Sequence, residues 1–380
     1  MAGIYVHIPF CRQACHYCDF HFSTYRALTR PVLEAIGKEL VLRQNFLADA
    51  PVDTIYFGGG TPSLLDIHDL NYLLDLIFKL FTVRDTCEIT LEANPDDLNK
   101  GKVQELKYSG INRLSIGAQS FQNEFLSYLN RIHSAEDIKR SFYFARECGF
   151  ENINLDLIYA IRENSADRLK KDIEEIEKLR PEHISAYCLT IEPATVFGRW
   201  TDKGRISPVP DQEAAEHFEK VADRFSMMNY DHYEISNYAR PGFISRHNTN
   251  YWKESAYLGI GPSAHSFNID QRQFNIANNA LYVKSLEQGK IPATIDYLSI
   301  KDRINERILT GLRTKWGCDL LGIHHDFGMD ILDRHREYLQ DLSDKGMIML
   351  CEGIMKLQQK GMLFADRIAS DLFVTEEEIR

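Results

Sequence analysis

The chain has 380 residues, of which 44% are hydrophobic and 26% are charged, so it is long enough to bury the core of a globular protein. Its 44 Lys and Arg residues against 55 Asp and Glu residues give a formal net charge of −11, which argues against a nucleic-acid-binding protein. The 22 Gly and 12 Pro residues are too few for a disordered or fibrous chain. Among its 8 cysteines, three fall within eight positions.

The chain begins MAGIYVHIPF, which lacks the pattern of a secretory signal, and its apolar runs are short and interrupted by charges. We therefore expect a cytoplasmic protein with no membrane span. In that compartment thiols stay reduced, and a tight cysteine cluster is more often metal-binding or catalytic than disulfide-bonded.

Short β-rich runs and stretches of helical spacing alternate through the first half of the chain. We expect strands at residues 3–8, 54–57, 88–93, 113–118, 153–159 and 183–189. We expect helices at residues 31–46, 66–81, 100–109, 135–148 and 166–179. Because parallel neighbours require crossover helices, this order predicts an α/β fold, and six units fall short of the eight that close a full barrel. We predict a partial (βα)6 TIM-like barrel, although a doubly wound sheet would give a similar pattern.

After residue 193 the alternation ends. A helix is expected at 211–228, and an aromatic and polar segment and the small-residue run GIGPSAHSF follow. Helices expected at 301–315 and 329–345, with the hairpin pattern MIML-CEG-IMKL, predict a small C-terminal helical, winged-helix-like domain in a structural or lid role. We divide the chain into a core at 1–235, a connecting segment at 236–300 and a C-terminal domain at 301–380.

A cluster of three cysteines follows the first expected strand with the spacing C-x3-C-x2-C: Cys11, Cys15 and Cys18. Three thiolates on one loop can hold an iron–sulfur cluster, in which one iron then keeps an open position. A structural zinc site would need a fourth ligand, for which His16, Asp19 and His21 are candidates, and the usual arrangement of two C-x2-C pairs is not present here. We favour a [4Fe–4S] cluster on the three cysteines. The other five cysteines are expected to be buried thiols.

This cysteine motif resembles that of the radical S-adenosylmethionine (SAM) superfamily, whose core is a partial (βα)6 barrel. The segments YVHIPFC, FGGGTPS, LEANPDD, GAQSF, LNRIH and NLDLIY extend the resemblance over nearly the whole chain, to the branch of the oxygen-independent coproporphyrinogen oxidases (HemN). The resemblance implies that SAM chelates the fourth iron and is cleaved reductively to a 5′-deoxyadenosyl radical. It also implies SAM contacts at Tyr5, Tyr17, Gly59, Gly60, Thr61, Glu92, Gln119, Arg131 and Asp156. Thr190 falls near a further such position.

Several of these positions also have a physical reason to bind a ligand. Gly58, Gly59 and Gly60 follow the second expected strand, where missing side chains let the backbone approach a ligand closely. Glu92 and Gln119 end expected strands, and polar residues at the carboxyl ends of barrel strands are typical of an active site.

Two features separate the chain from the oxidases. The oxidase motif continues to a fourth cysteine where Phe20 stands here, and we expect the oxidases' N-terminal extension to be missing. Both features resemble the heme chaperones of the same branch (HemW). A third is the H-N-x-x-Y-W motif from His247 to Trp252, which the resemblance associates with heme binding. An imidazole can ligate heme iron and aromatic rings offer flat apolar faces. His265 could be a second ligand or a structural residue.

The resemblance therefore implies a heme chaperone that binds a [4Fe–4S] cluster, SAM and heme and transfers heme to an acceptor protein, for which a respiratory protein is one candidate. The alternative is an oxygen-independent coproporphyrinogen III oxidase, an oxidative decarboxylase of porphyrin biosynthesis. A third interpretation is a zinc-stabilised barrel that binds a partner, against which the glycine-rich turn and the strand-end carboxylates argue. We expect no nucleic-acid partner, and the sequence leaves open whether the protein is an enzyme.

Overall fold

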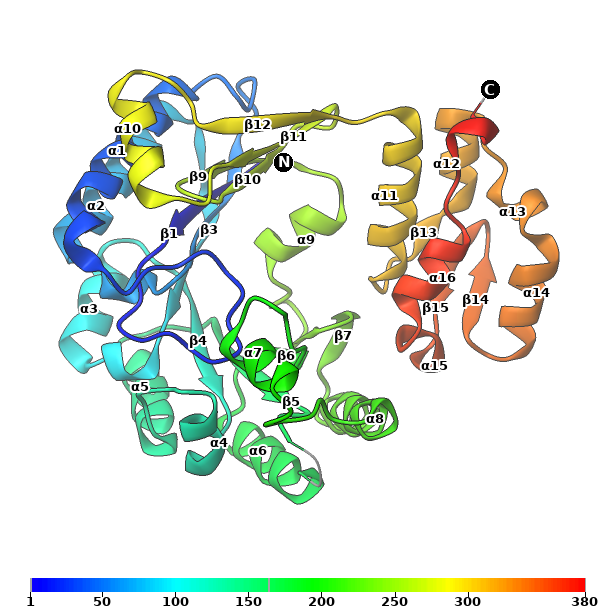
Figure 1. The fold of residues 1–380 in the computed structure, drawn as a ribbon, viewed down its shortest axis with the longest axis horizontal. Coiled ribbons are helices and arrows are strands. Elements are labelled where there is room, and N and C mark those ends of the chain that lie inside the picture. Colours follow the sequence, from blue (N-terminus) through cyan, green and yellow to red (C-terminus); the bar gives the residue numbers. More distant parts are fainter. Residues whose placement is uncertain (1, 163–164, 380) are drawn as a thin grey trace.

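A twelve-stranded sheet in the order β12-β11-β10-β9-β1-β2-β3-β4-β5-β6-β8-β7 organises most of the chain (Figure 1). The structure is a computed structural model that describes residues 2–162 and 165–379. Six neighbouring strands are parallel and lie where the sequence predicts them: β1 (Ala2–Ile8), β2 (Val52–Gly59), β3 (Val83–Ala93), β4 (Arg113–Gln119), β5 (Ile153–Tyr159) and β6 (His183–Cys188).

Helices connect these strands and cover the outside of the sheet (Figure 1). They are α1 (Thr29–Leu42), α2 (Ile67–Leu80), α3 (Lys100–Tyr108), α4 (Asn123–Tyr128), α5 (Ala135–Glu147) and α6 (Ala166–Leu179). Strand β1 shows why the two layers hold together, because its alternate residues Ile4, Val6 and Ile8 are fully buried and share one hydrophobic core with Leu33 of α1. Single 3₁₀ turns stand at Arg26–Leu28, Pro62–Leu64, Pro95–Asp97 and Glu376–Glu378.

The six parallel strands curl into a partial barrel. Side chains from five of them line one cavity: Tyr56 of β2, Glu92 of β3, Ser115 of β4, Asp156 of β5 and Ser185 of β6. A flat sheet could not direct these side chains at a common space. In the described sheet β1 and β6 pair with β9 and β8 instead of with each other, so the barrel stays open on that side. The predicted fold class is therefore confirmed.

The segment between β6 and the C-terminal domain extends this sheet at both edges. Helices α7 (Val196–Asp202) and α8 (Asp211–Met227) lead into β7 (Asp231–Glu234) and β8 (Asn237–Ala239) beside β6. On the β1 side lie α9 (Arg246–Trp252), β9 (Ala256–Ile260), β10 (His265–Phe267), β11 (Gln271–Asn275), α10 (Asn279–Glu287) and β12 (Ala293–Tyr297). The predicted connecting segment 236–300 thus contributes β8 to β12 to the same sheet as the core.

The C-terminal domain has its own hydrophobic core and stands beside the barrel (Figure 1). Its elements are α11 (Ile300–Leu312), β13 (Cys318–Asp319), α12 (Leu320–Phe327), α13 (Ile331–Arg334), α14 (Arg336–Asp344), β14 (Ile348–Cys351), β15 (Ile354–Leu357), α15 (Gln359–Met362) and α16 (Ala365–Asp371). The predicted hairpin is β14 and β15, whose two turn residues Glu352 and Gly353 have φ of 52° and 78°, as two-residue hairpin turns require. In the part of the chain that the structure describes, none of the helices has the length and apolar content needed to cross a bilayer.

Backbone hydrogen bonds join the C-terminal domain to the barrel at β7. The Lys315 N–H donates to the Tyr233 carbonyl at 3.0 Å, and the Ile235 N–H donates to the Arg313 carbonyl at 3.1 Å. The β11 residue Arg272 also forms an ion pair with Glu306 of α11 at 2.7 Å. We call the contacts around Tyr233 the interdomain joint.

Candidate functional site

The cysteine loop and the inward faces of the barrel strands enclose a cavity of about 400 Å³. All but two of the predicted site residues line it: Cys11, Cys15, Tyr17, Cys18, Gly59, Gly60, Thr61, Glu92, Gln119, Arg131 and Asp156. Thr190 and Phe20 line it as well. The two exceptions, Tyr5 and His247, pack behind the cavity wall against the ring of Tyr56, with ring centroids 6.0 Å and 4.9 Å from it.

The loop that carries the three cysteines is fastened to the barrel by backbone hydrogen bonds. The Gly60 N–H donates to the Ile8 carbonyl at 2.9 Å, and the Thr61 N–H donates to the Phe10 carbonyl at 2.8 Å. Further along the loop the His16 N–H donates to the Leu129 carbonyl at 3.1 Å. These bonds hold the cysteines against the glycine-rich turn at the mouth of the barrel.

Two of the cysteine sulfurs accept hydrogen bonds from the cavity wall. The Cys11 Sγ accepts from the Thr61 hydroxyl and the Cys15 Sγ accepts from Arg131 Nη1, both at 3.4 Å. Hydrogen bonds to the ligating sulfurs are among the features that tune iron–sulfur clusters. Burial raises the pKa of the Cys11 thiol.

The donor set can also be compared with a zinc site. Among the described residues, no three His, Cys, Asp or Glu side chains converge closely enough to hold a single metal ion. Zinc ligands must converge in this way, whereas each cysteine of a cuboidal cluster binds a different iron. The three cysteines are therefore compatible with a cluster in which each thiolate binds a different iron.

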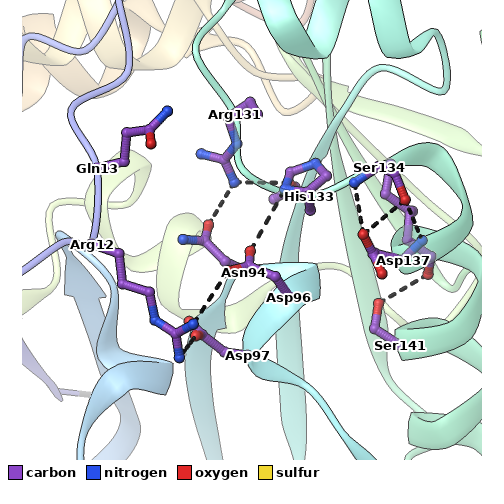
Figure 2. Close-up of polar contacts among 12 residues, drawn as sticks. Arg12, Gln13, Asn94, Asp96, Asp97, Arg131, His133, Ser134, Asp137 and Ser141 are labelled. Atoms are coloured by element: carbon purple, nitrogen blue, oxygen red, sulfur yellow. Dashed lines mark hydrogen bonds and ion pairs between the residues drawn. The ribbon is translucent and has the colours of Figure 1, made fainter.

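Arg131 reaches the cavity from the segment after α4. Its Nη2 donates to Asn94 Oδ1 at 2.5 Å and to the Gly117 carbonyl at 3.2 Å, as Figure 2 shows for Asn94. A Cβ at position 117 would lie 3.2 Å from this Nη2, so the glycine leaves room for the guanidinium. Arg131 is thus a half-buried residue of the cavity wall and not a free surface arginine.

The glycine-rich turn positions a carboxyl group beside the cysteines. Gly59 has φ of 105°, which favours glycine, and its N–H donates to Glu92 Oε2 at 3.1 Å. The Tyr56 hydroxyl donates to Glu92 Oε1 at 2.8 Å. Burial raises the pKa of Glu92 to about 7, and the two hydrogen bonds oppose this rise. The turn and Glu92 together offer acceptors for a ligand ammonium group.

Asp156 is connected through a buried chain of hydrogen bonds to the interdomain joint. Its Oδ1 accepts from Asn154 Nδ2 at 2.7 Å, and Asn154 Oδ1 lies 2.7 Å from His183 Nδ1. The other ring nitrogen of His183 lies 2.7 Å from the Tyr233 hydroxyl. Burial raises the pKa of Asp156 and lowers that of His183. The hydrogen bonds from the joint therefore extend to the cavity wall.

His247 is a buried residue of α9 with both ring nitrogens engaged. It is 2% exposed, its Nδ1 lies 2.8 Å from the Thr54 hydroxyl, and its Nε2 lies 2.9 Å from the Tyr251 hydroxyl. Burial lowers its pKa to about 3, so the ring is neutral. The other candidate, His265 on β10, does not line the cavity, and its ring packs near Phe274 with centroids 5.8 Å apart.

Sequence reasoning missed several residues of the cavity wall: Tyr56, Asn94, Arg113, Ser115 and Asn154. A sequence pattern that could have indicated them is a polar or small residue at every second position of a buried strand. The β4 sequence RLSIGAQ shows this pattern. This alternation indicates that the inner face of the barrel is polar.

Residues 5–176 match the model of the radical SAM superfamily, and residues 298–364 match that of the HemN C-terminal domain. Coproporphyrinogen III oxidase (HemN) of Escherichia coli, a radical SAM enzyme, superposes with a TM-score of 0.84 over 98% of this chain and 90% of that chain. Its sequence identity is 23%, so this likeness shows the fold alone. The partial barrel, the three cysteines after β1 and the matched model define a radical SAM protein, which implies a [4Fe–4S] cluster and SAM.

The similarity to curated proteins is more specific. The heme chaperone HemW of Bacillus subtilis (strain 168) is 34% identical over 373 residues, which are 97% of this chain and 98% of that protein. The heme chaperone HemW of Escherichia coli (strain K12) is 36% identical over 270 residues, 69% of either chain. The chain belongs to the HemW family.

Proposed function

We propose that this protein is a heme chaperone, which binds a [4Fe–4S] cluster, SAM and heme and transfers the heme to an acceptor protein. The observation that carries the proposal is the 34% identity with a heme chaperone over 97% of the chain. Phe20 agrees with the proposal, because it stands at the position where the resemblance places a fourth cysteine in the oxidases. Its side chain lines the cavity and is 71% exposed.

In this proposal Cys11, Cys15 and Cys18 hold the cluster, which when bound supplies an electron donor next to SAM. Gly59 and Glu92 receive the amino group of SAM, because the turn and the carboxylate offer acceptors at the mouth of the barrel. The other polar contacts to SAM come from the remaining predicted residues of the cavity: Tyr17, Gly60, Thr61, Gln119, Arg131 and Asp156. Tyr5 supports the wall from behind, through its contact with Tyr56.

We propose α9, with its H-N-x-x-Y-W motif, as the heme-binding element. Asn248 of this helix lines the cavity, so a heme bound there would lie beside the cluster and SAM. Ligation of heme iron by His247 requires its Nε2 to separate from the Tyr251 hydroxyl. Heme binding through His247 therefore includes a local rearrangement of α9.

Two substitutions test this role of His247. His247→Ala should weaken heme binding by roughly tenfold or more. Tyr251→Phe removes the competing hydrogen bond, worth about 1 kcal/mol, and should strengthen heme binding about fivefold. Both are measured by Soret titration, with iron content and SAM affinity as controls that should stay unchanged. An unchanged heme affinity in His247→Ala would remove this residue from the heme site.

The proposed function itself is tested by offering the anaerobically reconstituted protein heme and coproporphyrinogen III in parallel. We expect a Soret shift with heme and no protoporphyrinogen from coproporphyrinogen III. Turnover above that of a Cys15→Ala control would instead establish the oxidase activity.

We also propose that the protein acts in the cytoplasm on a protein acceptor and not on a nucleic acid. The net charge of −11 supports the second part. None of the 8 cysteines, all of which the structure describes, is in a disulfide, as is usual in a reducing compartment. The expectation that the five cysteines outside the motif are buried is wrong for Cys188 and Cys351, which are exposed. The division into a core, a connecting segment and a C-terminal domain stays a prediction.

A further inference from the structure

A buried guanidinium that forms no ion pair with any described residue lies on the cavity wall. Arg113, the first residue of β4, is 1% exposed and its side chain lines the cavity. Among the described residues, no carboxylate oxygen lies within 4.0 Å of this guanidinium, and its Nε has no hydrogen-bond partner. A second buried atom without a partner is adjacent, since Thr90 pairs with Arg113 across β3 and β4 and its hydroxyl is also unpaired.

The carboxylates near Arg113 are already engaged by other donors. Glu92 accepts hydrogen bonds from Tyr56 and Gly59, and Asp156 accepts from Asn154. Burial raises the pKa of Glu92 and of Asp156, and the positive charge of Arg113 opposes the rise in both. These two groups therefore balance the charge of Arg113 at a distance without satisfying its N–H donors.

An unpaired buried cation is costly, because the group loses its hydration and gains no equivalent partner. A guanidinium presents five N–H donors in a planar fork, and this fork matches the two oxygens of a carboxylate. A cavity that directs such a group at its interior is arranged for an anionic ligand. The competing explanation is a structural countercharge whose donors are satisfied by ordered water.

We propose that Arg113 binds a carboxylate of a ligand that extends into the barrel. In part this rests on the proposed function, whose ligands supply two kinds of carboxylate: the amino-acid carboxylate of SAM and the propionates of heme. Propionate is the expected source for two reasons. Arg113 begins β4, whereas the cysteine loop lies at the carboxyl ends of the strands. His247 of α9 is hydrogen-bonded to Thr54 and Glu88, which pair with each other two residues before the β3 residue Thr90 that pairs with Arg113. A heme at α9 would thus have its propionate within the range of Arg113.

The test combines modified ligands with a substitution. Heme is compared with its dimethyl ester, and SAM is compared with decarboxylated SAM, in the wild-type protein and in Arg113→Met. We expect the wild-type protein to bind heme roughly 10- to 100-fold more tightly than the ester, the range for a hydrogen-bonded ion pair, and Arg113→Met to lose this preference. Arg113→Lys should restore part of it. Arg146→Met removes an arginine that pairs with Glu182 outside the cavity, and should keep the full preference.

Each outcome distinguishes a different case. If Arg113→Met keeps the preference for heme over its ester but loses that for SAM over decarboxylated SAM, SAM is the source of the carboxylate. If it folds with the wild-type unfolding midpoint and keeps both preferences, Arg113 is a structural countercharge and the proposal is overturned. If Arg113→Met does not fold, the affinities of the wild-type protein decide. Equal affinity for heme and its dimethyl ester, together with equal affinity for SAM and decarboxylated SAM, overturns the proposal. Failure of the wild-type protein to bind heme would contradict the heme chaperone, while the SAM comparison would still decide the role of Arg113.

Discussion

Replacement of Cys15 by Ala is expected to abolish the iron–sulfur cluster. After anaerobic reconstitution the wild-type protein should contain about four iron and about four sulfide per chain, and the variant close to none of either. Cys15 is one of the three proposed cluster ligands, and its Sγ accepts a hydrogen bond from Arg131 Nη1 at 3.4 Å. With two ligands left, the cluster has no stable attachment, and SAM binding should weaken with its loss. The measurements are iron and sulfide assays and a SAM titration.

Cys188→Ala is the matched control for this experiment. Cys188 ends β6 and lines the same cavity, but it lies outside the C-x3-C-x2-C motif. This variant should keep the full iron and sulfide content. Loss of the cluster in Cys188→Ala, or its retention in Cys15→Ala, would contradict the assignment of the three ligands, and bound zinc without sulfide would contradict the cluster.

Gly60→Ala is expected to weaken both the fold and the cluster. A Cβ at this position would lie 2.7 Å from the Phe10 nitrogen and 2.8 Å from the carbonyl oxygens of Ile8 and Phe10. All three are backbone atoms, so the cysteine loop would have to move away from the glycine-rich turn. We expect the free energy of unfolding to fall by about 3 kcal/mol, from steric strain and weakened hydrogen bonds, and the iron content to fall with it. Urea denaturation and an iron assay measure the two effects.

Gly101→Ala separates this steric effect from a general effect of replacing glycine. Gly101 lies in the first turn of α3, and a Cβ there would meet only Asn99 Oδ1 at 3.4 Å. Because Ala favours a helix over Gly by about 1 kcal/mol, this variant should be as stable as the wild-type protein or more so. Equal stability and iron content in the two variants would refute the role assigned to Gly60.

The central strands and helices could be predicted because their signal is local. Strands such as β1 and β5 are short apolar runs, and the helices between them have apolar residues at helical spacing. The strands β9 to β12 could not be predicted in the same way, since each is only three to five residues long and its partners are set by the fold. β9, for example, pairs with β1, which lies at the start of the chain and far from β9 in the sequence. Gly259 shows the constraint, because a Cβ there would lie 1.9 Å from the His265 carbonyl oxygen.

The candidate site divides in a similar way. The cysteines, the glycine-rich turn and Glu92 could be predicted, because motifs and strand ends mark them. Arg113 could not, since only the curl of the sheet shows that this strand residue faces a cavity. The motif of His247 marked the residue but not its environment. Its partner Thr54 lies 193 positions away in the sequence, so only the tertiary structure shows that both ring nitrogens are engaged.

The hydrogen bonds from Tyr233 through His183 and Asn154 to Asp156 connect the cavity wall to the strand on which the C-terminal domain is held. Because the Lys315 N–H holds the backbone of Tyr233, a change in the orientation of the C-terminal domain strains or relaxes this chain. Linkage is reciprocal. If the domain's orientation changes the affinity of a ligand at Asp156, that ligand would in turn favour one orientation of the domain by the same free energy. A partner that holds the C-terminal domain in one orientation would thereby set how tightly the barrel retains its ligand.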